Sequence, residues 1–88
     1  LEHLSLNRCG LGDRGGLVVM RALPAGLREL GAAQNGMGWK ALQGMSASVM
    51  ARLRLLDLRG NLDRPSDLKP FWSNWLKTGK GELLMDYK

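Results

Sequence analysis

The stretch LEHLSL at residues 1–6 recurs as LRELGA at residues 27–32 and as LRLLDL at residues 53–58. Each copy begins 26 residues after the previous one. We call the first, fourth and sixth residues of each copy the framework positions. Eight of these nine positions hold leucine, and the ninth holds Ala32. A spacing kept over three copies is typical of proteins built from stacked structural repeats.

Each copy has the alternation of a short strand with one buried face. Leu4 and Leu6 are expected to point inward, while His3, Ser5 and Asn7 point outward. If successive strands stack in parallel at the usual spacing of about 4.8 Å, each leucine lies beside its equivalent in the next copy.

Three residues after each copy comes Cys9, Asn35 or Asn61. The chain must turn sharply there, and a buried Asn amide can satisfy backbone groups of its own turn and of the neighbouring one. Cys9 is expected to fill the same position as a small buried residue with a weak S–H donor. The three residues together are predicted to form a structural ladder.

The second half of each unit predicts helical structure. Asp13 is expected to cap a first helix, and the apolar spacing over residues 39–49 predicts a second helix of about three turns. A third helix is expected to start near residues 65–67, to hold Pro70 in its first turn and to end at Thr78 and Gly79. Residues 82–86 then predict a fourth strand, with Lys80, Leu83 and Met85 at its framework positions.

The motif L-x-x-L-x-L-x-x-N/C-x-L resembles that of leucine-rich repeat proteins. Residues 9–15, leading to Ala22-Leu23-Pro24, resemble the helix-containing repeats of the ribonuclease inhibitor and NOD-like receptor families. The 26-residue period with Cys9 is also similar to the cysteine-containing repeats of F-box proteins, and the subfamily stays open.

The resemblance implies an α/β solenoid, with short parallel strands on a concave side and helices on a convex side. We expect one domain or fragment over residues 1–88. Its repeats would span residues 1–26, 27–52 and 53–79, followed by the terminal strand at 82–86.

In leucine-rich repeat proteins the concave sheet usually binds the partner, so the resemblance predicts a non-catalytic protein–protein interaction module. The module would be a fragment or an accessory subunit of a larger assembly. The candidate partner face comprises the outward and edge residues His3, Ser5, Asn7, Arg28, Glu29, Arg54, Leu55, Asp57 and Arg59.

The two ends of the repeat array differ in sequence. Phe71, Trp72 and Trp75 are expected to form a hydrophobic lid over the C-terminal end, or else a partner contact. Leu1 enters the first strand directly, so we expect upstream repeats or another subunit to cover that edge. The final residues 86–88 match the opening of a common epitope tag, and whether they are native or tag-derived stays open.

Composition limits the remaining functions. Thirteen Lys and Arg against eight Asp and Glu give a net charge of +5 over 88 residues. Binding to RNA or to a membrane surface is therefore the alternative function, although the outward positions lack the aromatic residues on which bases stack. The longest apolar run, residues 17–20, is too short to span a bilayer.

The single cysteine and single histidine exclude an internal disulfide and most catalytic or metal-binding sets. We predict no enzymatic activity and no catalytic, cofactor-binding or metal-binding residues. The glycine-rich residues 10–16 match G-x-G-x-x-G only formally and are not expected to bind a nucleotide. An unpaired Cys9 favours a reducing intracellular location, in the cytosol, the nucleus or an organelle interior.

Overall fold

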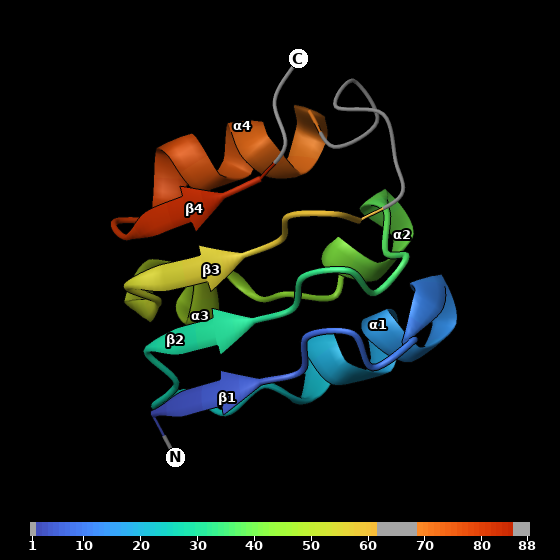
Figure 1. The fold of residues 1–88 in the computed structure, drawn as a ribbon. Helices are drawn as coiled ribbons and strands as arrows, with labels where there is room; N and C mark the ends of the chain where they lie inside the picture. Colours follow the sequence, from blue (N-terminus) through green and yellow to red (C-terminus); the bar gives the residue numbers. More distant parts are fainter. Residues whose placement is uncertain (1, 62–68, 86–88) are drawn as a thin grey trace.

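A computed structural model describes residues 2–61 and 69–85. Four short parallel strands form one sheet in the order β1-β2-β3-β4 (Figure 1). They are β1 His3–Ser5, β2 Glu29–Gly31, β3 Leu55–Asp57 and β4 Glu82–Leu84. The predicted strands and their parallel order are therefore present, although the expected features at Leu1, residues 65–67 and residues 86–88 lie outside the described residues.

The strand register follows the spacing of the sequence copies. Leu4 pairs with Leu30, and Leu30 pairs with Leu56, each 26 residues further on. Leu56 pairs with Leu83, which confirms the longer 27-residue step predicted for the last strand. Parallel pairing in register puts equivalent side chains side by side. Leu4, Leu30, Leu56 and Leu83 therefore all lie on the same side of the sheet.

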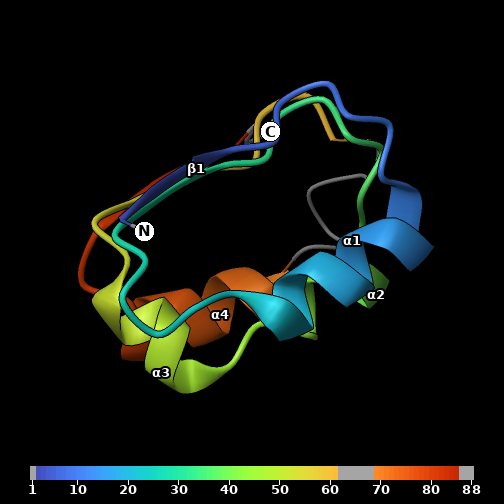
Figure 2. The ribbon, with the colours of Figure 1, turned by 90° about the horizontal axis from the view of Figure 1, so that it is seen from below.

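The helices cover one face of the sheet, and its other face is left open (Figure 2). They are α1 Gly12–Ala22, α2 Trp39–Leu42, α3 Ala47–Arg52 and α4 Lys69–Thr78. The structure is thus a mixed α/β arrangement of two layers, and its sheet does not close on itself. α4 holds Pro70 in its first turn and ends at Thr78, as predicted.

Two predictions about the helices are wrong. Asp13 does not cap α1, which begins at Gly12; its carboxylate instead accepts a hydrogen bond from the Gly38 backbone N–H at 2.7 Å. The helix expected over residues 39–49 is divided into α2 and α3. Ser46 caps α3, because its hydroxyl accepts from the Val49 N–H at 3.2 Å.

The core lies between the sheet and the helices. Leu27, Leu30, Leu53 and Leu56 are at most 1% exposed on the sheet side. Gly16 lets α1 approach α2, because a Cβ at this position would lie 2.8 Å from Ala41 Cβ. The remaining buried apolar side chains complete one cluster: Met20, Leu23, Ala32, Met37, Ala41, Leu42, Met45, Val49, Met50, Leu58, Phe71, Trp75 and Met85.

Candidate functional site

The open sheet face is the surface formed by the strand residues that point away from the helices. Alternation along each strand puts His3, Glu29, Leu55 and Glu82 in one row across the sheet. A second row consists of Ser5, Gly31, Asp57 and Leu84. The face therefore brings together His3, Ser5, Glu29, Leu55 and Asp57 of the predicted partner face, with Asn7 and Arg59 at equivalent positions just beyond β1 and β3.

Two polar contacts join the first copy to the second, one on this face and one between the turns that follow β1 and β2. His3 Nδ1 lies 2.8 Å from Glu29 Oε1, and both side chains are largely exposed. Arg8 Nε donates to Gln34 Oε1 at 2.6 Å. Each pair joins equivalent positions 26 residues apart, so the strand register itself sets the partners.

Asp57 and Arg59 form a bidentate pair on the same face. Arg59 Nε and Nη2 donate to the two Asp57 carboxylate oxygens at 3.0 and 2.9 Å. The Arg59 backbone N–H also donates to Asp57 Oδ1 at 3.1 Å. The Arg59 guanidinium, chiefly through its hydrogen bonds, holds the pKa of the Asp57 carboxyl below its usual value, against an opposing effect of burial. The pair thus stays charged and fixed in position.

Asn7 has a structural contact as well as an outward position. Its Oδ1 accepts from the Ala33 N–H at 2.8 Å, and its Nδ2 lies 3.4 Å from Ser5 Oγ. The same oxygen would lie 3.0 Å from a Cβ at Gly31. The Asn7 amide therefore covers Gly31, and a larger residue there would have to displace it.

Leu84 belongs to the open face, although the candidate set predicted from the sequence omits it. It pairs with Asp57 and is half-buried, as is Leu55 on β3. The predicted register with Leu83 inward already implies that Leu84 points outward. Leu55 and Leu84 together give the face an apolar patch over β3 and β4.

Arg28 and Arg54 occupy a different place from the other predicted partner-face residues. Each directly precedes a strand, and both line a cavity at the end of the sheet where the strands begin. They are thus separated from the open sheet face.

The predicted ladder contains two asparagines with full sets of hydrogen bonds. Asn35 Oδ1 accepts from the N–H groups of Cys9 and Leu11 at 2.8 and 3.4 Å, and its Nδ2 donates to the carbonyls of Leu6 and Ala33. Asn61 makes a similar set of contacts one copy later, three of them at equivalent positions. Its Oδ1 accepts from Asn35 N and Met37 N, and its Nδ2 donates to Ala32 O and Leu58 O.

The burial expected for Cys9 is wrong. Its side chain is exposed, and its thiol lies 3.7 Å from the Asn7 carbonyl. Each ladder side chain reaches back toward the preceding turn, as Asn61 reaches toward Asn35. Among the described residues, no turn of an earlier copy lies beside the turn that contains Cys9. The Cys9 side chain therefore has no turn to reach and stays at the surface.

The aromatic lid is narrower than predicted. Phe71 and Trp75 are 1% and 5% exposed, and their ring centroids lie 6.3 Å apart. Trp72 points outward and is 36% exposed, and Leu76 one turn later is 63% exposed. Of the three predicted lid residues, therefore, only Phe71 and Trp75 are buried in the core.

The glycine-rich stretch has a backbone role. Gly10 and Gly12 adopt φ of 65° and 64°, a left-handed conformation that favours glycine. Within residues 2–61 and 69–85, no cluster of three His, Cys, Asp or Glu side chains is suited to a metal ion. The helices in this part of the chain are all too short or too polar to cross a bilayer.

Comparison of the chain with protein-family models, curated proteins and solved structures gives no match.

Proposed function

We propose that the chain is a leucine-rich repeat module whose open sheet face binds another protein. The repeat interpretation is supported by the 26-residue strand register and by the equivalent hydrogen bonds of Asn35 and Asn61. Its three copies and terminal strand correspond to the four strands of the sheet. The parallel strands with helices on one side have the two-layer arrangement of such repeats.

The observation that carries the binding proposal is the organisation of the open sheet face. Leu55 and Leu84 form an apolar patch over β3 and the edge strand β4, and the Asp57–Arg59 and His3–Glu29 pairs lie on β1 to β3 and just beyond β3. An apolar patch with polar side chains beside it has the two components of a usual protein interface. Because hydrogen bonds already hold these polar side chains, little side-chain entropy remains to be lost on binding.

Site-specific photocrosslinking tests this proposal. A photoreactive residue at Leu55 should form adducts with a partner in a native-cell extract, and the same residue at Lys40, on the helical side, should not. The Arg59→Glu variant should weaken the Leu55 adduct, because Arg59 is 60% exposed and its reversal changes the charge beside the apolar patch. Lys40→Glu is the matched control. Equal loss in both variants, or adducts only at position 40, would contradict a site on the open sheet face.

We further propose that the module works within a larger assembly that covers β1. β1 lies at an edge of the sheet, and Leu4 and Leu6 are only half-buried, whereas the equivalent Leu30 and Ala32 are at most 1% exposed. Full burial of a leucine contributes roughly 1.5–3 kcal/mol. The 88-residue chain should therefore self-associate or melt at a modest temperature. Light scattering that finds a monodisperse monomer with a high Tm would contradict a covered edge.

A further inference from the structure

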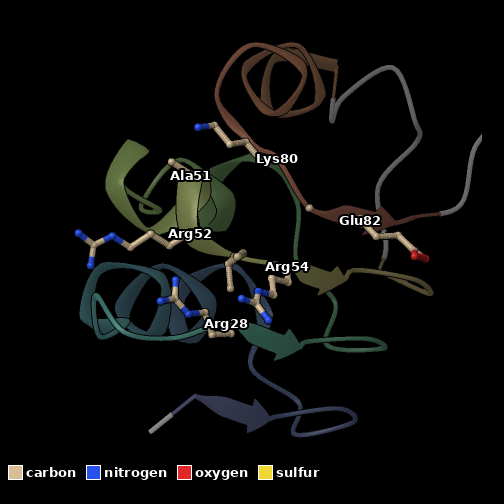
Figure 3. Close-up of a pocket in the computed structure, with 8 residues that line it drawn as sticks. Arg28, Ala51, Arg52, Arg54, Lys80 and Glu82 are labelled. Atoms are coloured by element: carbon tan, nitrogen blue, oxygen red, sulfur yellow. The ribbon is translucent and has the colours of Figure 1, made fainter.

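A cavity of about 580 Å³ lies where the chain enters β2, β3 and β4 (Figure 3). Arg28 and Arg54 stand directly before β2 and β3, and Lys80 and Gly81 stand before β4. The end of α3, at residues 51–52, and Leu53 supply the rest of the wall together with Glu82. This volume lies within the range of roughly 300–1,000 Å³ in which proteins bind small molecules.

The cavity carries a concentrated positive charge. Four of its eight lining residues are cationic, Arg28, Arg52, Arg54 and Lys80, against the single carboxylate of Glu82. Figure 3 shows the Glu82 carboxylate directed away from these cations. The wall of the cavity therefore carries a net positive charge.

Most of these cations have no partner within the described chain. Across residues 2–61 and 69–85, neither Arg28, Arg54 nor Lys80 forms an ion pair or a side-chain hydrogen bond. Arg52 makes one long contact, in which Nη1 donates to the Ala25 carbonyl at 3.4 Å. Their hydrogen-bond donors are consequently available to a ligand.

The strand pairing fixes where these charges lie. The Arg54 N–H donates to the Arg28 carbonyl at 2.6 Å, and the Glu82 N–H donates to the Arg54 carbonyl at 2.8 Å. Neighbouring strands lie about 4.8 Å apart, so the two arginines start from adjacent backbone positions. Like charges side by side repel each other, and an anion held between them would remove that cost.

We propose that this cavity binds an anion that carries two or more phosphate groups close together. The planar guanidinium matches the geometry of phosphate oxygens and can donate two parallel hydrogen bonds to them. A diphosphate or triphosphate supplies several negative charges over a short span, as the clustered cations require. The phosphate groups belong to a soluble molecule or to a phosphorylated lipid headgroup. This site uses residues outside the open sheet face and is independent of protein binding there.

Isothermal titration of the 88-residue chain with inorganic tripolyphosphate tests the proposal at a salt concentration of about 150 mM, where surface charges are screened beyond about 8 Å. We expect saturable binding of one tripolyphosphate per chain. The double variant Arg28→Gln/Arg54→Gln should weaken it at least about tenfold, because charge-assisted hydrogen bonds to phosphate are among the strongest in proteins. The absence of saturable binding to the folded wild-type chain overturns the proposal.

The control variant Arg14→Gln/Lys77→Gln removes the same charge from exposed positions on α1 and α4. It should change the Kd by less than about twofold, since distant surface charges are screened. Equal weakening in both double variants would mean that only net charge is sensed and would refute a site. The glutamines leave the backbone bonds of positions 28 and 54 in place, and circular dichroism checks that the fold persists. Tripolyphosphate should raise the Tm of the wild-type chain and of the control, but not that of the cavity variant.

Vesicle sedimentation distinguishes the two phosphate sources. Phosphatidylinositol bisphosphate carries two separate phosphate groups on one inositol ring. Binding to phosphatidylcholine vesicles that contain this lipid, lost in the cavity variant and displaced by tripolyphosphate, identifies a lipid headgroup. Tripolyphosphate binding without vesicle binding identifies a soluble ligand. If the cavity variant binds these vesicles and phosphatidylserine vesicles as well as the wild-type chain does, general surface charge explains the attraction and the site is wrong.

Discussion

Replacing Asn61 with leucine should destabilise the chain more than the same change at Asn35. Asn61 serves Asn35 N, Met37 N and Ala32 O, each at 3.0 Å, and Leu58 O at 2.8 Å. All four partners belong to residues that are at most 3% exposed. Asn61 is itself half-buried, and in Asn61→Leu these four backbone groups of buried residues all lose their amide partner.

The expected loss of stability follows from the number of backbone groups left without a hydrogen-bond partner. A buried donor left without a partner costs about 1–3 kcal/mol, so the two N–H groups alone predict a loss of roughly 2–6 kcal/mol for Asn61→Leu. In Asn35→Leu, the N–H of exposed Cys9 can turn to water, and the Leu11 contact is already long at 3.4 Å. We therefore expect a loss of about 1–3 kcal/mol there.

Urea denaturation followed by circular dichroism measures both losses, and a constant m value indicates that the same surface is exposed in each variant. Asn74→Leu is the matched control, because Asn74 is exposed on α4 and should change stability by no more than about 0.5 kcal/mol. A loss in Asn61→Leu that is no larger than in Asn74→Leu would refute the buried amide ladder. A larger loss in Asn35→Leu than in Asn61→Leu would refute the burial argument used to rank them.

Three further changes test the packing and the open sheet face. Gly16→Ala should cost about 1–3 kcal/mol by forcing α1 from α2, whereas Gly26→Ala, with open space around its Cβ, should be nearly neutral in the same denaturation assay. Trp75→Ala should cost about 3–5 kcal/mol because its ring is buried, and Trp72→Ala should cost less than half as much; similar losses would contradict the outward placement of Trp72. Because the pKa of Asp57 is lowered in the folded chain, its stabilising effect is present above the unfolded pKa of about 3.9 and is lost as the pH falls below it. Stability measured from about pH 5 to pH 2.5 should therefore fall less in Asp57→Asn than in the wild-type chain, and equal slopes would contradict the lowered pKa.

The strands and their register could be predicted from the sequence because burial dictates the framework positions. Leucine recurs where the chain faces the helices, and one step of 27 residues is enough to align Leu83 with Leu56. The division between α2 and α3 could not be predicted from the apolar period. Gly44 lies between the two helices, and a Cβ there would lie 2.8 Å from Leu17 Cδ1 on α1, a contact that the apolar period does not reveal.

Site residues could be predicted where a local pattern places them and could not where contacts between distant segments decide. His3, Glu29 and Asp57 follow from alternation along a strand, which is a local property. The exposure of Cys9 depends on what lies next to its turn, which its residue type does not reveal. Lys80 was assigned to a framework position, but it is exposed and lines the basic cavity. That cavity joins residues from three strand starts and a helix end, so it exists only once the copies are stacked.

The two proposed sites lie at positions of the copies where burial does not dictate the residue type. They differ in whether that residue type changes or repeats from copy to copy. The outward row His3, Glu29, Leu55 changes in chemistry from strand to strand, because no packing partner constrains it. A surface that varies along the array can match one particular protein. Arg28 and Arg54, by contrast, repeat the same cation at an edge where burial does not require it. Two equivalent arginines placed side by side without carboxylate partners in the described chain create a repulsion that a polyphosphate would relieve. The two proposed sites therefore use separate residues, so protein binding on the open sheet face and anion binding where the strands begin would not exclude each other.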